Sequence, residues 1–498
     1  MARAGLPALA VLVLASACLP GGAGTTSTSA AAAASPGSKS NIVFVLTDDL
    51  AWNLVQYMPH VQQMQKQGTT FSNYYVTDSL CCPSRSSIFT GKFPHDTGIF
   101  TNGGSDGGFG AFQRRGEEKD TFATQLQAAG YQTAMMGKYL NGYEPKQALG
   151  GSKPYVPPGW NEWDVAGNGY PEFNYDLNEN GKVVHYGNQP QDYLTDVVSG
   201  KGASFIDRSA SASKPFMLEI ATFAPHGPYT PAPRDANAFP GLTAPKTPAF
   251  NQQDTVGEPP WLAGLPPLKP AEAQNIDTDF RKRAQAVQAV DQMLARLQQE
   301  LTAKGVARNT YVVFSSDNGY HMGDHRLRPG KMTAFDTDIK VPLIATGPGV
   351  PAGRTAGQLS QNIDLAPTFA DLGGARVPDS EDGHSLAPLL SGKEPGDWRN
   401  ATLVEHHGPD RDRTDPDVPA KNSGNPPTYE AIRTPNSLYV EYTDGEREYY
   451  DTANDPYELR NLAGQLPPAQ AQSLHDTLVA SQNCHGSTSC WTAQHQKG

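Results

Sequence analysis

Apolar positions along this chain fall into short continuous runs that alternate with longer helical repeats. Residues 41–46 form a continuous apolar run of strand length, which is typical of a strand buried on both faces of a mainly parallel sheet. Residues 280–304 place apolar side chains every three or four positions and end at Gly305, which predicts a long amphipathic helix. Further strands are predicted at 131–136, 215–222, 310–315 and 341–346, and further helices at 120–129, 193–206 and 365–372.

The alternation of strands and helices predicts an α/β fold, with a large, mostly parallel sheet sandwiched by helices. After about residue 395 the pattern changes to four short strands, and Asp444-Gly445 marks a hairpin turn between the last two. These strands predict a small C-terminal antiparallel sheet. They are expected at 402–405, 429–433, 437–442 and 448–451.

The 498 residues exceed what one simple core accommodates, so we expect two domains of unequal size. The main α/β domain is predicted at 41–395, and a small α+β subdomain with a tail at 396–498. Two Gly- and Pro-rich stretches, 141–192 and 227–270, interrupt the regular pattern. Long irregular segments in a compact domain are usually functional, so both are predicted to form the rim of a substrate pocket.

Residues 1–40 read as a targeting leader followed by a flexible linker. The apolar stretch at 6–19 is too short to span a bilayer, and the Ala/Ser/Thr/Gly-rich stretch that follows cannot bury a core. The residues before Cys18 look like a degenerate lipobox, which would make Cys18 the site of a lipid anchor. The alternative is cleavage by a signal peptidase near Ala17 or Ala23. Both alternatives predict export, either as a secreted protein or as a lipoprotein on the outer face of the membrane.

Cysteine usage and charge narrow the functional classes. Cys484 and Cys490 lie in a short segment and are predicted to form a disulfide in an oxidising compartment. A metal site formed by Cys484, His485 and Cys490 is the alternative, but it would have too few ligands. The net charge of -12 and the absence of a basic run argue against nucleic-acid binding. An acidic protein that acts on anions must concentrate its positive charge locally.

Two pairs of oxygen-donor side chains follow predicted strands. Asp48 and Asp49 come directly after the first strand, and Asp317 and Asn318 follow the strand at 310–315. Ligands bind at the carboxyl edge of open α/β sheets, and adjacent carboxylates favour a neutralising cation. An Asp after a strand can also simply cap a helix. If the four side chains do bind a metal, oxygen ligands without His or Cys favour Ca²⁺ over Zn²⁺, with Mg²⁺ as the alternative.

The segment Cys-Cys-Pro-Ser-Arg-Ser-Ser-Ile-Phe-Thr-Gly at 81–91 resembles the C-x-P-S-R-x-x-x-[LF]-T-G signature of type I sulfatases, in the alkaline phosphatase superfamily. The resemblance implies that a formylglycine-generating enzyme oxidises Cys81 to formylglycine, whose hydrate is the nucleophile. It also implies that Asp48, Asp49, Asp317 and Asn318 share one divalent cation, usually calcium, with position 81. Two adjacent cysteines in a turn at Pro83 are the alternative interpretation.

The same resemblance implies roles for four basic residues. Arg85, within the signature, would hold the formylglycine hydrate. Lys138, in Gly-Lys-Tyr-Leu-Asn, and Lys331, in Gly-Lys, would contact the sulfate. His226, in Ala-Pro-His-Gly-Pro-Tyr, would lie beside the leaving-group oxygen, where a histidine of near-neutral pKa can supply a proton.

The sequence departs from many arylsulfatases two residues after Lys138. Leu140 stands where those enzymes carry a histidine, and Asn141 is predicted to take over part of its polar role. His321 and His325 lie just past the second oxygen-donor pair and are predicted to line the substrate side. Together with Asn141 they complete the predicted substrate-binding residues.

The resemblance extends over about residues 41–465 and is strongest to the N-acetylglucosamine-6-sulfatase branch. The segments 138–141, 317–321 and 335–342 carry the resemblance to this branch. It implies a sulfuric ester hydrolase acting on a sulfated carbohydrate such as N-acetylglucosamine 6-sulfate. Two alternatives stay open: a phosphonate monoester or phosphodiester hydrolase of the same superfamily, and an inactive relative that only binds glycans.

Overall fold

The structure of the protein is a computed structural model that describes residues 39–411, 415 and 417–495. The predicted leader and the fate of Cys18 therefore lie outside the described residues. Among the described residues, no helix combines the length and the apolar character needed to cross a membrane.

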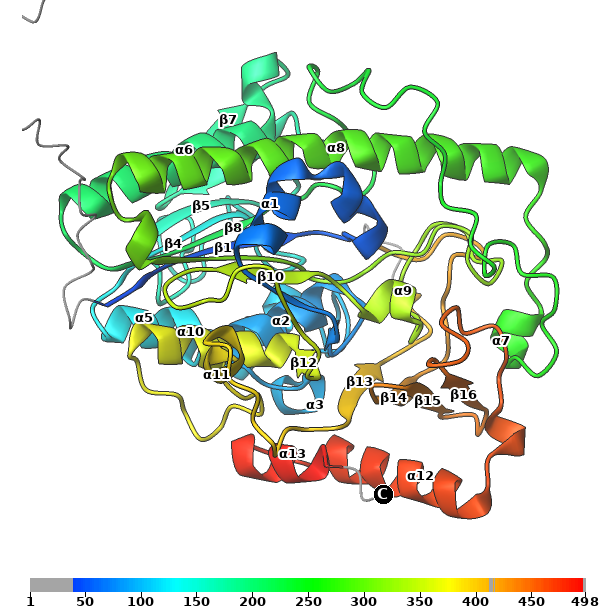
Figure 1. Cartoon of the computed structure of the whole chain (residues 1–498). Helices are drawn as coiled ribbons and strands as arrows, with labels where there is room; N and C mark the ends of the chain where they lie inside the picture. The colour runs from blue at the N-terminus through cyan, green and yellow to red at the C-terminus, as the bar shows by residue number, and fades with distance from the viewer. Residues whose placement is uncertain (1–38, 412–414, 416, 496–498) are drawn as a thin grey trace, which may run out of the picture. The chain divides into compact units, whose positions relative to one another are not determined.

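A ten-stranded sheet forms the centre of the fold, and its middle strands are parallel (Figure 1). Strand β1 (Asn41–Thr47) pairs in parallel with β8 (Phe216–Ala221) and β9 (Thr310–Ser316), and β4 (Gln132–Lys138) continues beyond β8. The order is β11-β2-β10-β9-β1-β8-β4-β5-β6-β7, which confirms the predicted large sheet. The other strands are β2 (Thr69–Phe71), β5 (Glu162–Ala166), β6 (Tyr175–Glu179), β7 (Lys182–Tyr186), β10 (Leu343–Thr346) and β11 (Arg354–Ala356).

Helices cover both faces of this sheet because β1 is apolar on both sides. Val43 and Val45 join the cluster that includes α1, α6 and α8, whereas Phe44 and Leu46 join the cluster with α2, α5 and α10. Figure 1 shows α6 and α8 on one side of the sheet and α5, α10 and α2 on the other. The bounds are α1 (Pro59–Gln67), α6 (Leu194–Ser211), α8 (Pro270–Ala303), α2 (Cys81–Thr90), α5 (Phe122–Ala128) and α10 (Leu365–Gly373).

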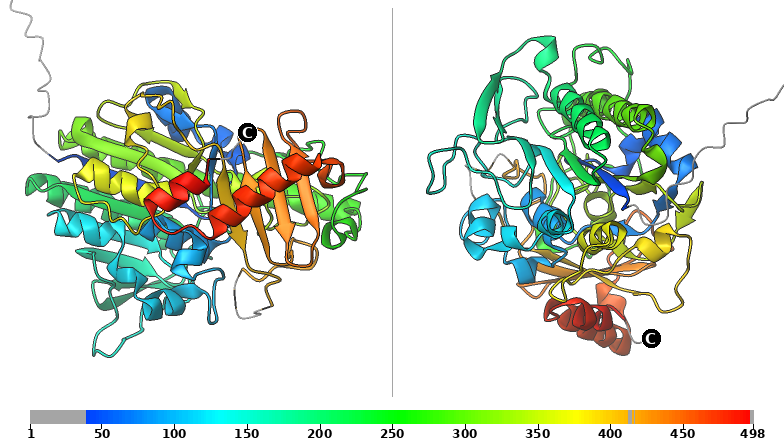
Figure 2. Two further views of the ribbon diagram at one scale, coloured as in Figure 1. Left: turned by 90° about the horizontal axis from the view of Figure 1, so that it is seen from below. Right: turned by 90° about the vertical axis from the view of Figure 1, so that its left-hand side faces the viewer.

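The predicted C-terminal antiparallel sheet is also confirmed. It contains β13 (Thr402–His406), β14 (Tyr429–Arg433), β15 (Ser437–Tyr442) and β16 (Arg447–Asp451), in that order. Helix α12 (Pro468–Gln482) lies across it (Figure 2). Arg433 links this sheet to the rest of the fold through an ion pair with Asp336 at 2.8 Å. Small elements complete the list: β3 (Tyr74–Tyr75), β12 (Ser360–Gln361), α3 (Pro94–Thr97), α4 (Gly108–Arg115), α7 (Pro260–Ala263), α9 (Asp336–Ile339), α11 (Ala387–Leu390) and α13 (Ser487–Ala493).

The predicted elements differ from the observed ones mainly where many polar residues obscure the apolar pattern of a buried face. Helix α8 begins ten residues before the predicted start, because its polar first turns still bury Ile276. Within 141–192, three strands extend the sheet, and Asn180 and Gly181 form the tight turn of the β6–β7 hairpin with positive φ. The stretch at 227–270 is irregular apart from α7.

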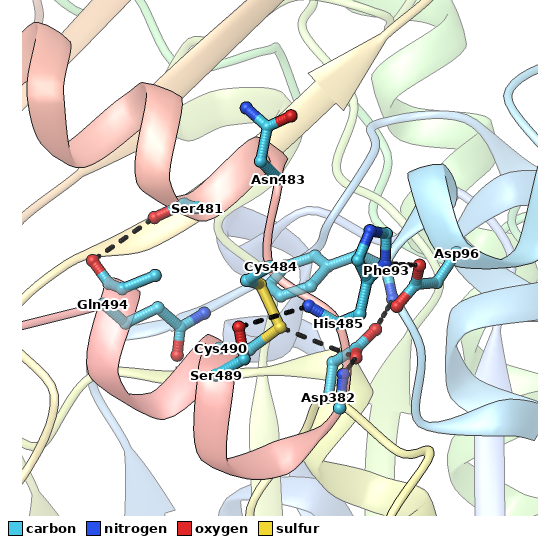
Figure 3. Close-up of a disulfide and its surroundings, with 12 residues drawn as sticks. Phe93, Asp96, Asp382, Ser481, Asn483, Cys484, His485, Ser489, Cys490 and Gln494 are labelled. Carbon is cyan, nitrogen blue, oxygen red and sulfur yellow. Dashed lines mark hydrogen bonds and ion pairs between the residues drawn. A yellow bond between two sulfur atoms is a disulfide. The ribbon is translucent and has the colours of Figure 1, made fainter.

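Cys484 and Cys490 form the predicted disulfide (Figure 3). Both cysteines are buried and belong to an apolar cluster with Phe93, Leu474 and Leu478. The bond therefore links the segment after α12 to α13, and both cysteines pack with Phe93, the residue before α3. In the same view His485 points away from the disulfide and pairs with Asp96.

We predict that replacing both cysteines, in Cys484→Ser with Cys490→Ser, destabilises the protein without changing its chemistry. The closed loop spans a sequence separation of 6, and a loop of this length is worth about 2 kcal/mol of unfolding free energy. Denaturant unfolding should show this loss, while the activity per folded molecule stays at the wild-type value. Equal stability of the double variant and the wild type would contradict the prediction.

Candidate active site

The topology brings the predicted site residues to one edge of the sheet. Strands β9, β1, β8 and β4 are parallel neighbours, so their carboxyl ends meet at the same edge. Asp48 and Asp49 follow β1, and Asp317 and Asn318 follow β9. Lys138 is the last residue of β4. His226 follows β8 by a few residues and completes the arc of side chains.

Three carboxylates lie buried at this edge. Asp48, Asp49 and Asp317 are at most 1% exposed. Asp49 has a φ of 63°, a left-handed conformation that Asp adopts more readily than most residues. Its backbone N–H donates to Asp317 Oδ1 at 3.1 Å, and Asn318 Nδ2 donates to Asp49 Oδ1 at 2.6 Å. Such a concentration of buried negative charge requires compensation by nearby cations.

Each of the three carboxylates pairs with one buried cation. Lys138 Nζ lies 2.6 Å from Asp48 Oδ2, Lys331 Nζ lies 2.7 Å from Asp49 Oδ1, and Arg85 Nε lies 2.7 Å from Asp317 Oδ2. Burial opposes the charge of both lysines, but the neighbouring carboxylates outweigh it and hold each lysine pKa well above its ordinary value. Both lysines therefore stay protonated in the site.

Cys81 lies at the centre of these charges. It is the first residue of α2, and its Sγ is 3.2 Å from Asp48 Oδ1 and 2.9 Å from Lys331 Nζ. Arg85 follows one helical turn later, on the same face of α2. Burial raises the pKa of the Cys81 thiol well above its usual value, and the carboxylates of Asp417 and Asp48 raise it further. A thiol that stays neutral is a poor nucleophile.

The arrangement offers ligand atoms for a metal ion. One atom from each of Asp48, Asp49, Cys81 and His226 lies within 4.8 Å of the others. Asn318 donates through Nδ2 to Asp49 of this group, and its Oδ1 is buried and has no hydrogen-bond partner among the described residues. An unpartnered buried oxygen beside three carboxylates fits a hard cation that prefers oxygen ligands.

His226 contacts a carboxylate that sequence reasoning missed. Its Nδ1 donates to the carbonyl of Gly227 at 2.9 Å, and its Nε2 bonds Asp417. Burial lowers the affinity of His226 for a proton, but Asp417 and Asp49 outweigh this and raise its pKa to about 9. Asp417 belongs to a charged, Pro- and Gly-rich loop with several other acidic residues, and no sequence pattern singled it out.

Part of the predicted pocket rim contributes side chains to the site. From 141–192, Asn141 donates through Nδ2 to Asp417 Oδ2 at 3.1 Å, and the Tyr170 ring lies 4.9 Å from Lys138 Nζ. An open cavity of about 220 Å³ adjoins the site. It is lined by Asp49, His226, Gly227, Tyr320, Lys331, Asp417 and the segment 418–420, among others.

His321 and His325 lie in different surroundings from Asn141. His321 is buried, and its two ring nitrogens bond Asp338 and the Ser423 carbonyl. His325 bonds Gln252 at 2.8 Å and lines a second cavity of about 440 Å³, which lies beyond Tyr320. Their predicted contact with substrate stays a prediction.

Comparison with known proteins places the chain in a family. Residues 40–375 match the family model described as Sulfatase, and residues 323–483 match N-sulphoglucosamine sulphohydrolase, C-terminal. The N-acetylglucosamine-6-sulfatase of Homo sapiens is 36% identical over 477 residues, covering 90% of this chain and 86% of the relative. The N-acetylglucosamine-6-O-sulfatase of Bacteroides thetaiotaomicron is 28% identical, with 87% and 84% covered. An extracellular sulfatase homologue of Drosophila melanogaster is 34% identical over 74% of this chain and 33% of its own length.

Solved structures show the same fold. One similar protein, solved in complex with its substrate D-glucosamine-2-N,6-O-disulfate, has a TM-score of 0.74 at 26% identity, covering 89% of this chain and 97% of that one. The phosphonate monoester hydrolase of Agrobacterium radiobacter has a TM-score of 0.67 at 20% identity, with 89% and 95% covered. This second likeness concerns the fold alone. The family match over most of the chain and the close sulfatase relatives show that this protein belongs to the sulfatase family and is a sulfuric ester hydrolase.

Proposed function

We propose that this protein hydrolyses the 6-sulfate ester of an N-acetylglucosamine-type sugar, using formylglycine at position 81 and a divalent cation. The overall reaction consumes water and releases the sugar alcohol and hydrogen sulfate. The observation that carries the proposal is the position of Cys81, at the start of α2 and within 3.2 Å of both Asp48 and Lys331. The identity to N-acetylglucosamine-6-sulfatases supports the choice of substrate.

The proposed cation is Ca²⁺, with Mg²⁺ as the alternative. Asp48, Asp49, Asp317 and Asn318 would hold it together with position 81, and the unpartnered Asn318 Oδ1 supports this set. When bound, the cation supplies positive charge beside the sulfuryl oxygens.

Formylglycine at position 81 fits the surroundings of Cys81. The hydrated aldehyde would supply two hydroxyls. One would lose its proton and attack sulfur as the bond from sulfur to the sugar oxygen breaks, and loss of the proton of the second would then re-form the aldehyde and release sulfate. Arg85 lies one turn further along α2 and presents Nη2, which is buried and has no hydrogen-bond partner among the described residues. This free donor supports the role of Arg85 in holding an oxygen at position 81, where the thiol offers none.

Lys138, Lys331 and His226 are proposed to act on the substrate. The two lysines remain protonated, so they can bind the sulfuryl oxygens and stabilise the charge that accumulates there. His226 lines the cavity and is proposed to hold a proton on Nε2, the atom that bonds Asp417, and to deliver it to the departing sugar oxygen. Asn141, His321 and His325 are proposed to contact the sugar.

We propose that the protein is exported. The predicted leader at 1–40 supports this, as do the Cys484–Cys490 disulfide and the name of the extracellular relative in Drosophila melanogaster. Lipid attachment at Cys18 and cleavage of the leader remain the two proposed routes. A formylglycine-generating enzyme is the proposed partner during maturation, and a sulfated carbohydrate is the proposed substrate.

We predict that Cys81→Ser leaves a folded protein that does not turn over. A serine sulfate ester has no second hydroxyl to expel sulfate, so kcat for a sulfate ester should fall by about a thousandfold or more. Peptide mass spectrometry of the wild type should show an aldehyde at position 81. Cys82→Ala is the matched control, because Cys82 lies in the apolar core and should not be modified. Full multiple turnover by Cys81→Ser would refute the mechanism.

We predict that Ca²⁺ stabilises the protein through the carboxylate group. Chelation should lower the melting temperature of the wild type, and added Ca²⁺ should restore it, because a ligand that binds only the folded state stabilises it. Asp317→Asn should weaken Ca²⁺ binding at least about tenfold in calorimetry. Asp291→Asn is the control, since Asp291 is a buried carboxylate that bonds backbone N–H groups of α1. If neither Ca²⁺ nor Mg²⁺ changes the melting temperature of the wild type, the cation proposal is contradicted.

We predict a preference for 6-sulfated glucosamine derivatives over phosphorus esters. The value of kcat/KM for N-acetylglucosamine 6-sulfate should exceed that for a phosphonate or phosphate monoester by at least about a hundredfold. Equal or faster cleavage of the phosphorus esters would contradict the proposed function and would indicate a phosphonate monoester hydrolase. Binding of the sulfated sugar without turnover, by protein carrying the aldehyde, would indicate a glycan-binding relative.

A further inference from the structure

One carboxylate in the site belongs neither to the proposed cation ligands nor to the ion pairs that neutralise them. Asp417 lies in the loop between β13 and β14, and only 1% of its side chain is exposed. The cluster of convergent ligand atoms, formed by Asp48, Asp49, Cys81 and His226, does not include it. Its position therefore requires a separate explanation.

The side chain of Asp417 accepts four hydrogen bonds from groups around the cavity. Oδ1 accepts from His226 Nε2 and from Lys331 Nζ at 3.2 Å. Oδ2 accepts from Asn102 Nδ2 at 2.9 Å and from Asn141 Nδ2 at 3.1 Å. A carboxylate has about four lone-pair positions, and here all four are used. None is left to bind a sugar hydroxyl, so the group is arranged as an anion bound by donors.

Three of these donors are the groups proposed to bind the substrate. Lys331 and His226 are proposed to contact the sulfate and the departing oxygen, and Asn141 to contact the sugar. A sulfate ester is also an oxyanion that needs charged and amide donors. Two anions cannot share the same buried donors without strong repulsion. Substrate binding and the observed position of Asp417 are therefore mutually exclusive.

The described contacts of the loop around Asp417 are mostly those of its side chain and of residues further along the loop. The backbone hydrogen bonds found for the described residues 415 and 417–420 stay inside the loop, such as Val418 N–H to Asp415 O. The firm attachments lie further along, where Arg328 N–H donates to Asn422 O at 2.8 Å and His321 bonds the Ser423 carbonyl. Among the described residues, this part of the loop is linked to the site by the contacts of Asp417 and by a hydrogen bond from Asn102 Nδ2 to Asp415 Oδ1 at 3.4 Å.

We infer that the Asp417 carboxylate is an internal competitor that occupies the sulfate position and that the substrate's sulfate group must displace. This inference rests on the proposed function, because it assigns Lys331 and His226 to the sulfate. The competition reduces the apparent affinity of the site by the fraction of molecules in which Asp417 is withdrawn. It also gives Lys331 and His226, which both lie near Asp49, a second carboxylate partner when no substrate is present.

Calorimetric binding of inorganic sulfate to the Ca²⁺-loaded protein tests this inference. Asp417→Ala and Asp417→Asn should bind sulfate at least about tenfold more tightly than the wild type. For a chromogenic aryl sulfate, KM should fall by a similar factor while kcat stays within about twofold. Asp444→Asn, which removes one carboxylate from an exposed turn after β15, is the charge-matched control and should change neither value.

Unchanged or weaker sulfate binding by both folded Asp417 variants would overturn the inference, as would an increase in KM. Such a KM increase would mean that Asp417 contacts the substrate directly. The result remains separable from the proposed function because sulfate binding needs no turnover. Tighter sulfate binding by the variants of a protein that hydrolyses no sulfate ester would refute the proposed function alone. Normal hydrolysis with unchanged sulfate binding would refute the competitor role alone.

Discussion

The site depends on the pairing of three buried carboxylates with three buried cations. Asp48, Asp49 and Asp317 are excluded from water, so their negative charge would be unstable without Lys138, Lys331 and Arg85. Removing one partner from a buried pair costs about 3–5 kcal/mol, because it leaves the other charge uncompensated. The pairs therefore fix the ends of β1, β4 and β9 and the first turn of α2 relative to one another.

The same pairs link the binding of a cation to the binding of an anion. Lys138 and Lys331 hold oxygens of Asp48 and Asp49, which are also the proposed ligands of Ca²⁺. A divalent cation on these carboxylates competes with the lysines for the same oxygens. If the proposed cation binds there, the lysine ammonium groups would be released to hold other anions, such as the sulfate group of the proposed substrate. Metal binding would then favour substrate binding through charge balance.

Much of this arrangement could be predicted from the sequence, because its elements carry local signals. Continuous apolar runs located the central strands, and the parallel order then determined where Asp48, Asp317 and Lys138 would meet. The signature at 81–91 identified Cys81 and Arg85, although their helix was not among the predicted elements. Asp417 could not be found this way, since its loop has no periodicity and its partners come from distant segments. The surroundings of His321 likewise depend on Asp338 and on the Ser423 carbonyl, contacts that no local pattern encodes.

The parts of the site that could be predicted from the sequence and the parts that could not lie in different kinds of structural element. The groups proposed for chemistry lie at strand ends and on α2, where regular backbone geometry fixes them. The groups that shape the cavity come from loops, and Asp417 and the segment 418–420 reach it from the loop between β13 and β14. The small C-terminal sheet anchors that loop at both ends, so it acts on the site without contributing a reacting group. If Asp417 competes with the substrate as inferred, changes in this loop would alter which anions enter, while the charge pairs at the strand ends stay intact.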